Sequence, residues 1–366
     1  MGDALNVGII GAGKISTAYA TTLVRLPDIT VTRVADLDAG RADALAAELP
    51  GALAVAPDEL LADDKVDVVL NLTVPQAHAA VALAAIASGK HVYGEKPLAA
   101  STTEARGVLD AAARAGVVVG CAPDTVLGTG LQTARASLSA GDIGTPVAAT
   151  AFMVTPGHER WHPSPEFYYQ PGGGPLFDMG PYYLTALVTL LGPVRRVTGM
   201  SATPRATREI GAGPRAGTVF PVDVATHVSG ILEHTGGALT TLMMSFDIWD
   251  AQLPRIEVYG SAGSLSVPDP NHFAGPVRLF TATTGERIDV PERAGYRDAA
   301  RGYGVADLAR SLRDGTPPRA SGDLAFHVLD VMERILEAAE TGTAVEVTSR
   351  CTVPAPVPFG ARPDRE

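Results

Sequence analysis

The chain has 366 residues, 46% of them hydrophobic and 19% charged, which is enough apolar material for two packed domains and excludes a largely disordered chain. The net charge of −11, with no basic cluster to offset it, argues against a nucleic-acid partner. The two cysteines, Cys121 and Cys351, form neither a disulfide framework nor a zinc motif, and the N-terminus has no apolar signal segment. We therefore predict a cytoplasmic protein with no membrane and no nucleic-acid partner.

The first third of the chain alternates short apolar runs with helical spacings of apolar residues. The strand-like runs are apolar on both faces, which is typical of a parallel sheet covered by helices on both sides. The expected strands are 5–10, 31–35, 66–71, 91–95 and 117–121, and the expected helices are 15–26, 41–49, 77–88 and 101–115. This alternation predicts the α/β fold class, with a doubly wound parallel sheet in an N-terminal domain, residues 1–123.

The pattern changes after Pro123. Residues 156–175 contain five prolines and four glycines in twenty positions, which predicts a long loop with a functional role. Gly236-Gly237 is a hairpin-turn signal between two strand-like runs. The expected strands are 147–155, 194–200, 227–232, 238–248, 255–259 and 264–267, and the expected helices are 177–191, 305–313 and 324–340. We predict an α+β domain with a mostly antiparallel sheet over residues 124–350, followed by a Pro-rich tail, 351–366.

The turn after the first strand, Gly11-Ala12-Gly13-Lys14-Ile15-Ser16, fits the dinucleotide-binding pattern G-x-G-x-x-G/A except for its serine. The first glycine permits the tight turn, the second lets a pyrophosphate approach the backbone, and serine is small enough for the third position. The helix that follows offers free N–H groups and the positive end of its dipole. We expect Gly11, Gly13, Lys14 and Ile15 to bind a dinucleotide; the alternative is a Gly-rich turn without a ligand.

Asp36 stands at the end of the second strand, 25 residues after Gly11. A carboxylate there can accept a hydrogen bond from the adenosine 2′-OH and would repel a 2′-phosphate, which favours NAD as the cofactor. Arg33 and Arg41 lie nearby in the sequence and could offset that repulsion, so NADP stays the alternative.

Two further loops follow strands at the carboxyl edge of the expected sheet, where open α/β sheets bind ligands. The first contains Thr73, Pro75 and His78, and the second is Glu95-Lys96-Pro97. A lysine beside an oxidised nicotinamide would lose solvation and meet a like charge, and both effects lower its pKa and suit proton transfer. Taken alone, the first loop is also an ordinary strand-to-helix turn, and Lys96 an ordinary surface lysine beside a glutamate.

Another cluster follows the long loop, in the segment Gly172–Tyr182. Asp178 and Tyr182 are four residues apart, so on a helix they share one face. A carboxylate beside a phenol can orient it or accept a hydrogen bond from a substrate hydroxyl. The alternative is that Asp178 caps a helix and Tyr182 packs against its neighbours.

The segments GAGKIS, TVPQAH, GKHVYGEKP and GGGPLFDMGPYY, together with Asp36, resemble in order and spacing the Gfo/Idh/MocA family of glucose–fructose oxidoreductase, inositol dehydrogenase and rhizopine-catabolism proteins. The resemblance covers roughly residues 5–345 and implies an N-terminal Rossmann domain and a C-terminal α+β domain with an open sheet. It also implies that Lys96 contacts nicotinamide ribose and substrate and relays a proton, and that Asp178 binds or orients the reacting hydroxyl.

One position departs from the family pattern. Many members carry a histidine four residues after the aspartate, where this chain has Tyr182. The departure shifts the acid/base role toward Tyr182 with Lys96 as its electrostatic partner, because a tyrosine with an ordinary pKa of about 10 needs a nearby cation to ionise near neutral pH. The predicted catalytic residues are therefore Lys96, Asp178 and Tyr182.

The segment His158-Glu159-Arg160-Trp161-His162 matches the zinc-binding pattern H-E-x-x-H, which requires a helix. Prolines on both sides make a helix improbable, so we predict no metal site. We expect a substrate lid instead, in which Trp161 presents an apolar face to a sugar ring and His158 or His162 binds hydroxyls. The alternative is a surface loop.

Together these features predict an NAD(P)-dependent sugar or polyol dehydrogenase acting on CH–OH groups. Two alternatives remain at this point: an NAD-dependent glycosidase with transient oxidation and no net redox, and a catalytically inactive NAD-binding sensor or regulator. The open sheet face would expose apolar area, which predicts a homodimer or homotetramer.

Overall fold

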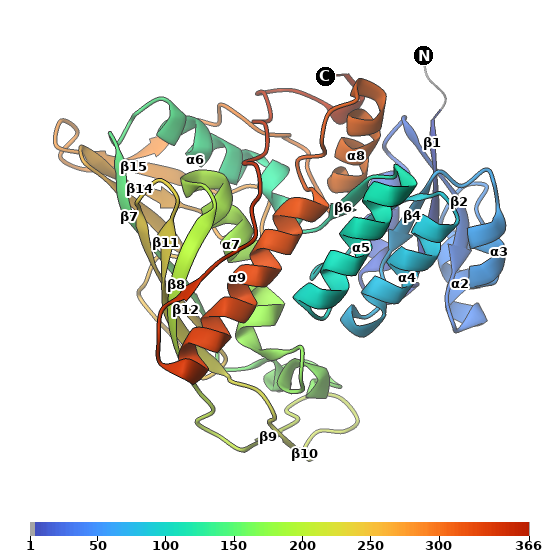
Figure 1. The fold of residues 1–366 in the computed structure, drawn as a ribbon, viewed down its shortest axis with the longest axis horizontal. Helices are drawn as coiled ribbons and strands as arrows, with labels where there is room; N and C mark the ends of the chain where they lie inside the picture. The colour runs from blue at the N-terminus through green and yellow to red at the C-terminus, as the bar shows by residue number, and fades with distance from the viewer. Residues whose placement is uncertain (1–3, 366) are drawn as a thin grey trace. The chain divides into compact units, whose positions relative to one another are not determined.

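The computed structural model describes residues 4–365, and their packing separates into two units (Figure 1). Unit 1 contains the chain up to Gln132, Arg293–Phe326 and the chain from Pro354 onward; unit 2 contains Thr133–Glu292 and His327–Val353. The chain therefore returns twice to unit 1, which the spacing of apolar residues does not indicate. The expected division into a dinucleotide-binding domain, 1–123, a substrate-binding and oligomerisation domain, 124–350, and a Pro-rich tail, 351–366, stays a prediction.

Unit 1 is built on a six-stranded parallel sheet with the strand order β3-β2-β1-β4-β5-β6. The strands are β1 (Leu5–Ile10), β2 (Ile29–Ala35), β3 (Leu53–Ala54), β4 (Val68–Asn71), β5 (His91–Gly94) and β6 (Val119–Cys121). The helices between them are α1 (Ser16–Leu23), α2 (Ala39–Ala47), α3 (Pro57–Ala62), α4 (Pro75–Ala87) and α5 (Thr102–Ala115). The predicted doubly wound α/β architecture is confirmed.

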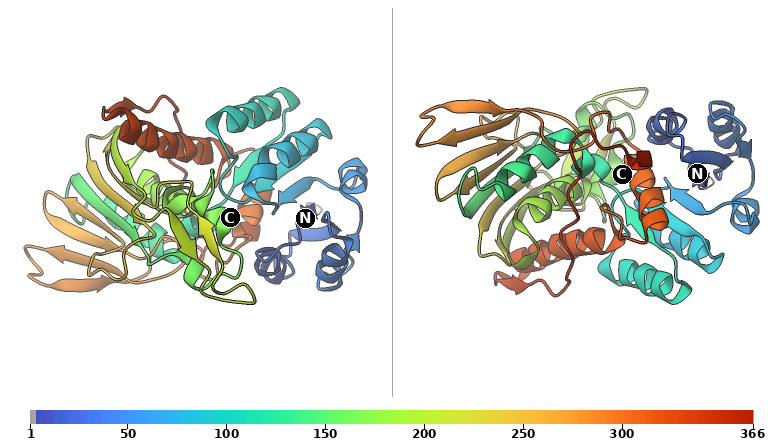
Figure 2. Two further views of the ribbon diagram at one scale, coloured as in Figure 1. Left: turned by 90° about the horizontal axis from the view of Figure 1, so that it is seen from below. Right: turned by 90° about the horizontal axis from the view of Figure 1, so that it is seen from above.

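Helices cover both faces of this sheet: α1 and α2 lie on one face, and α4 and α5 lie side by side on the other (Figure 2). The central strands are consequently buried on both sides, which is why their sequences are continuously apolar; all four residues of β4 are buried. The strand order reverses at β1, which lies between β2 and β4. The loops after these strands therefore open at one edge of the sheet, where ligands bind in this class of fold.

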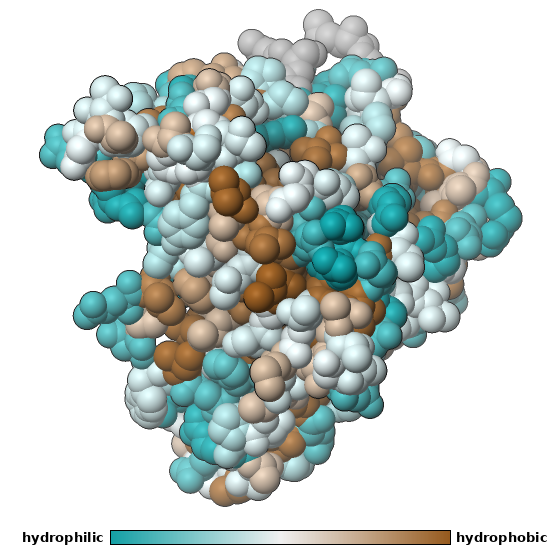
Figure 3. All heavy atoms as spheres, turned by 60° about the vertical axis from the view of Figure 1, so that its left-hand side comes forward, coloured by the Kyte–Doolittle hydropathy of each residue, from teal (hydrophilic) through white to brown (hydrophobic). Residues whose placement is uncertain are grey.

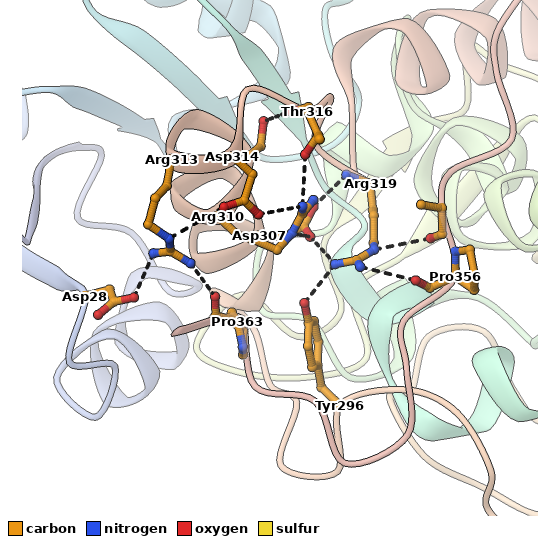
Figure 4. Close-up of polar contacts among 12 residues, drawn as sticks. Asp28, Tyr296, Asp307, Arg310, Arg313, Asp314, Thr316, Arg319, Pro356 and Pro363 are labelled. Atoms are coloured by element: carbon orange, nitrogen blue, oxygen red, sulfur yellow. Dashed lines mark hydrogen bonds and ion pairs between the residues drawn. The ribbon is translucent and has the colours of Figure 1, made fainter. Parts of the chain in front are cut away.

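The returning segments are held in unit 1 by buried polar contacts (Figure 4). Helix α8 (Tyr303–Asp314) packs against β5 and β6. The buried guanidinium of Arg319 lies 2.7 Å from Asp307 Oδ1, and it donates to the Tyr296 hydroxyl at 2.9 Å and to the carbonyl oxygen of Pro356 at 3.2 Å. One arginine thus ties the two returning stretches of chain together. Two short 3-10 helices also belong to this unit, η1 (Asp124–Leu127) and η4 (Pro363–Arg365).

Unit 2 holds a nine-stranded sheet with the order β16-β15-β14-β13-β7-β12-β11-β8-β17. Its neighbours are antiparallel except for the pair β7 and β12, which confirms the mostly antiparallel prediction. The strands are β7 (Pro146–Val154), β8 (Val194–Ala202), β11 (His227–His234), β12 (Leu239–Ser245), β13 (Ile256–Gly260), β14 (Gly263–Val267), β15 (Val277–Thr281), β16 (Arg287–Val290) and β17 (Val345–Glu346). A separate two-stranded sheet pairs β9 (Thr207–Glu209) with β10 (Val219–Pro221).

Helices cover one face of the large sheet. α7 (Gly174–Leu191) contacts β7, β11 and β12, and the second half of α9 (Gly322–Thr341) packs close to β8 (Figure 1). Close packing of α9 requires Gly199, because a Cβ atom there would lie 2.3 Å from the carbonyl oxygen of Ile335. The remaining helices are α6 (Thr129–Ser139), η2 (His158–Arg160) and η3 (Glu166–Tyr169). Over residues 4–365 no helix has both the length and the apolar composition that a bilayer span requires.

Candidate functional site

The glycine turn between β1 and α1 has the geometry that a dinucleotide needs. Gly11 has a φ of 105°, and a Cβ atom there would lie 2.6 Å from the carbonyl carbon of Leu72. A Cβ atom on Gly13 would instead meet no atom within 4 Å. The first glycine is therefore required by the fold itself, whereas the second leaves open the space through which a pyrophosphate reaches the backbone.

Ser16 fills the third position of the motif without disturbing the turn. Its side chain is buried, and its hydroxyl donates to the carbonyl oxygen of Gly13 at 2.7 Å. Lys14 and Ile15 are exposed just before α1 begins. The turn thus presents its backbone N–H groups and the start of α1 at the carboxyl edge of the sheet, which suits an anion.

Asp36 lies against the same turn. Its Oδ2 accepts a hydrogen bond from the Ala12 N–H at 2.7 Å, and its Oδ1 accepts one from the Asp38 N–H at 2.9 Å. The two nearby arginines are engaged elsewhere, since Arg33 pairs with Asp63 at 2.6 Å and Arg41 with Asp38 at 3.5 Å. The carboxylate is fixed beside the glycine turn, and each arginine that could offset its charge has an acidic partner of its own.

The loops after β4 and β5 are joined to each other through His78. The imidazole is buried; its Nδ1 lies 2.6 Å from the Pro97 carbonyl oxygen and its Nε2 lies 3.1 Å from that of Thr73. Burial lowers the pKa of His78, against the opposing effect of the two carbonyl oxygens. The ring therefore contacts a backbone group of each loop. Pro75 stands at the start of α4.

Glu95 fixes the backbone that carries Lys96. The Tyr19 hydroxyl of α1 donates to Glu95 Oε1 at 2.7 Å, and Glu95 Oε2 accepts from the Lys96 N–H at 3.1 Å. Unit 1 therefore brings the glycine turn, Asp36, Thr73 and the Glu95–Pro97 loop to the carboxyl ends of neighbouring strands. Sequence reasoning identified these residues but not the link through Tyr19, since a tyrosine at helical spacing is indistinguishable from a core residue.

In unit 2 the long loop and α7 meet at Asp178. Asp178 and Tyr182 lie one turn apart on α7, with Tyr182 buried. The Nε2 atom of His158 lies 2.9 Å from Asp178 Oδ2, and both side chains are largely enclosed, at 13% and 17% exposure. The structure thus brings together two of the expected site residues that are 20 positions apart in the chain.

The segment 156–175 is anchored to the body of unit 2 by a buried ion pair. Glu159, at 4% exposure, accepts from Arg208 Nη1 at 2.9 Å and from the hydroxyl of Tyr169. Arg208 also pairs with Asp247 at 2.6 Å, and Asp247 accepts from Thr226 at 2.6 Å. Burial and the Glu159 carboxylate raise the pKa of Tyr169, so its hydroxyl stays a donor. Sequence spacing could not reveal this network, because Glu159 and Arg208 are separated by 49 residues.

These contacts also bear on the H-E-x-x-H pattern. His158–Arg160 forms a single 3-10 turn instead of the α-helix that the zinc motif requires, and Glu159 is held by Arg208. Within the described part of the chain, no group of three or more His, Cys, Asp or Glu residues could hold a metal ion. Trp161 is 52% exposed, and its ring centroid lies 5.3 Å from that of His158 and 5.4 Å from that of His162.

Comparison with known proteins adds to this geometry. Residues 5–122 match the oxidoreductase family model with an NAD-binding Rossmann fold, and residues 131–266 match the Gfo/Idh/MocA C-terminal domain. The chain belongs to the Gfo/Idh/MocA family. It is therefore a member of an NAD(P)-binding oxidoreductase family, and the predicted family, Rossmann domain and nicotinamide cofactor are confirmed. The open space beside Gly13 and the placement of Asp36 fit that cofactor.

Gfo/Idh/MocA relatives and solved structures match almost the whole chain. A D-xylose 1-dehydrogenase (NADP(+)) of Haloferax volcanii is 31% identical over 93% of this chain and 99% of its own length. A myo-inositol 2-dehydrogenase of Thermotoga maritima is 25% identical over 87% and 91%. The crystal structure of an NAD-binding oxidoreductase from Klebsiella pneumoniae has a TM-score of 0.80 at 24% identity and covers 94% of this chain and 99% of that chain. Such structural likeness shows the fold, and the relatives are sugar and polyol dehydrogenases.

Proposed function

We propose that the protein is an NAD-dependent dehydrogenase that interconverts a sugar or polyol CH–OH group and its carbonyl. The observation that carries the proposal is that a carboxylate, Asp178, and a phenol, Tyr182, lie one turn apart on α7 in a chain that also contains an NAD-binding Rossmann domain. The relatives that act on xylose and on myo-inositol support the substrate class.

The cofactor, when bound, accepts or returns the hydride of the reacting carbon. Gly11, Gly13, Lys14 and Ile15 would hold its pyrophosphate, and Asp36 its adenosine ribose. The loops with Thr73 and Pro75 and with Glu95 and Pro97 would hold the nicotinamide half, and His78 would keep those two loops in register.

The remaining steps belong to three side chains. Asp178 holds and orients the reacting hydroxyl before its proton is transferred. Tyr182 takes the hydroxyl proton during oxidation and returns it during reduction. Lys96 would be the electrostatic partner of that phenol, because a tyrosine with an ordinary pKa of about 10 needs a nearby cation to ionise near neutral pH. Trp161 offers an apolar ring face to the sugar, and His158 and His162 lie on the same segment.

NAD is preferred over NADP in this proposal. The fixed Asp36 carboxylate would repel a 2′-phosphate, and the two nearby arginines each have an acidic partner, Asp63 for Arg33 and Asp38 for Arg41. The Haloferax volcanii relative is named for NADP(+). The preference for NAD proposed for this chain therefore rests on its own residues around Asp36.

The test is an absorbance assay for reduced nicotinamide that crosses NAD and NADP with inositols, hexoses, pentoses and sugar acids. We expect turnover with NAD and one group of these substrates. Tyr182→Phe should lower kcat by about 10²- to 10⁴-fold, the range for loss of a general acid–base group, with NAD binding by calorimetry unchanged. Wild-type kcat in that variant would contradict the role of Tyr182. The absence of reduced nicotinamide with every substrate, in protein that binds NAD, would contradict the dehydrogenase.

A further inference from the structure

Tyr19 is a fully buried residue of α1, the helix that begins at the glycine turn. Its ring belongs to the apolar core of unit 1, together with residues of the central strands such as Ile9 and Leu70. A ring packed in this way has little freedom left, so a further contact of its hydroxyl has a low entropic cost. The core of unit 1 therefore holds this polar atom at a defined point.

The hydroxyl of Tyr19 holds the side chain of Glu95. It donates to Glu95 Oε1 at 2.7 Å, and Glu95 Oε2 accepts from the backbone N–H of Lys96 at 3.1 Å. Burial raises the pKa of Tyr19 well above its ordinary value, and the negative charges of Glu95 and Asp124 raise it further. The hydroxyl therefore keeps its proton and remains a donor, and the carboxylate lies between α1 and the Lys96 amide with a hydrogen bond on each side.

The backbone on either side of Lys96 is held as well. The Glu95 N–H donates to the carbonyl oxygen of Asn71 at 2.9 Å, and the Pro97 carbonyl oxygen lies 2.6 Å from His78 Nδ1. These contacts fix where the loop lies. The bond to Glu95 Oε2 fixes how the planar peptide unit between Glu95 and Lys96 is turned, and this orientation sets the direction in which the Lys96 side chain leaves the backbone.

Loss of the Tyr19 hydroxyl would reach Lys96 by way of Glu95. The carboxylate is partly buried, and one of its oxygens would be left without the donor that holds it. A carboxylate in that position turns toward water or another donor, because an unsatisfied charged group is costly. Its second oxygen then moves away from the Lys96 N–H, and the peptide unit is free to turn.

We propose that Tyr19 is the positioning residue of Lys96, holding the Glu95 carboxylate so that it sets the direction of the Lys96 side chain. The inference rests on the role proposed for Lys96 in the dehydrogenase and deepens it by adding a residue that acts through Glu95. All the groups of this link belong to unit 1. Because Tyr19 stands on the helix that begins at the glycine turn, the segment proposed to hold the pyrophosphate and the loop proposed to hold the nicotinamide half share one hydrogen-bonded link.

The first test needs no substrate. Hydrogen exchange, followed by mass spectrometry on overlapping peptides around Pro97, measures the protection of the Lys96 N–H in protein without NAD. In Tyr19→Phe this amide should exchange about tenfold faster than in wild type, as expected when a hydrogen bond loses its support. The increase should exceed any change at the amides of β1, since a fold that is merely destabilised would accelerate both alike.

Tyr93→Phe is the matched control for this measurement. The Tyr93 hydroxyl is as deeply buried as that of Tyr19, but it has no hydrogen-bond partner among the described residues. The Tyr93→Phe substitution removes the same atom from the same core without breaking a contact to Glu95. The Lys96 amide should therefore exchange at the wild-type rate in this variant.

The second test uses the substrate that the absorbance assay identifies. Tyr19→Phe should lower kcat by about 10- to 100-fold, the effect of a misplaced catalytic group, with NAD binding by calorimetry unchanged. In a Lys96→Met background the same change should cause no further loss of kcat, because the group to be positioned is absent. Tyr93→Phe should keep the wild-type kcat.

Wild-type exchange of the Lys96 amide in Tyr19→Phe, or exchange raised equally throughout unit 1, would overturn the inference even if no substrate is found. An equal further loss of kcat in the Lys96→Met background would overturn it too, since Tyr19 would then act on the fold and not through Lys96. A wild-type protein that binds NAD and turns over no substrate would instead contradict the proposed function. The exchange measurement would still decide whether Tyr19 holds the Lys96 backbone, so the two failures are distinguishable.

Discussion

At the scale of single residues, Gly11 and Gly13 differ in the surroundings that a side chain would meet at each position. Gly11 has φ > 0, and the Leu72 backbone fills the place of its Cβ atom, so alanine there is strained whether or not NAD is bound. Gly13 faces open space, so alanine there strains nothing in the free protein and obstructs only a ligand. One motif therefore contains a position that serves the fold and a position that serves the cofactor.

Two alanine variants separate these roles. Gly11→Ala should lower the free energy of unfolding by about 1–3 kcal/mol, the cost of a strained backbone position. Gly13→Ala should leave unfolding unchanged in the absence of NAD but weaken NAD binding by about tenfold, or ~1.4 kcal/mol. Urea unfolding and calorimetric titration with NAD measure the two effects. A stable Gly11→Ala, or a Gly13→Ala that binds NAD normally, would refute the division.

Residue types were predictable at this scale where a motif fixes them, as for Gly11, Asp36 and Lys96. Their partners were not. Tyr19 reaches Glu95 across 76 residues and Arg208 reaches Glu159 across 49, and such contacts depend on the folded backbone and not on any local pattern. The contact of His158 with Asp178 was missed for the same reason, although both residues were expected in the site.

At the scale of elements, His327 joins three segments of unit 2. Its Nε2 accepts from the Val194 N–H at the start of β8, at 3.0 Å, and its Nδ1 lies 2.8 Å from the hydroxyl of Ser349 after β17. The residue is fully buried on α9, and burial lowers its pKa to about 4. A protonated ring could not accept from Val194, so the contact requires the neutral form.

This histidine should make the stability of the protein depend on pH. Above the ordinary pKa of about 6.5 the ring is neutral in both folded and unfolded chains, and its contribution is fully present. As the pH falls from 6.5 to 4, the unfolded chain binds a proton that the folded chain excludes, and up to about 3 kcal/mol is lost. Urea unfolding between pH 7 and pH 4 should show this loss reduced in His327→Gln. His272→Gln, at an exposed site, should behave as wild type, and equal pH dependence in both variants would contradict the assignment.

Elements with a strong apolar period were predictable, and weakly patterned ones were not. β4 and α7 are apolar because they are buried, and their sequences predict them. β3 has two residues, and β16 is mostly exposed, so neither has enough apolar spacing to be recognised. The strands β9 and β10 have three residues each and depend on pairing with each other.

At the scale of the whole molecule, the nine-stranded sheet of unit 2 has a face opposite to its helices. On that face, the register of the strands places Met200 beside Ser229, and Ile231 beside Thr198 and Thr241. The same face continues across the neighbouring strands from Leu239 to Phe280. Met200 is 79% exposed, Leu239 48% and Ile231 47%. Exposed apolar side chains also gather on the side of the chain shown in Figure 3. A broad face that combines such residues with polar ones is typical of an interface.

We therefore predict a homodimer, or a homotetramer built from such dimers, that forms through this sheet face. In a two-fold contact each substitution appears twice, once from each chain, so Ile231→Glu with Met200→Glu places four carboxylates in one interface. Light scattering should give a multiple of the chain mass for wild type and a smaller mass for the double variant, which is that of one chain from a dimer and that of two chains from a tetramer with a second interface. Val219→Glu, which alters an equally exposed apolar residue on β10, should keep the wild-type mass. A wild-type protein with the mass of a single chain would refute the prediction, as would a double variant with the wild-type mass.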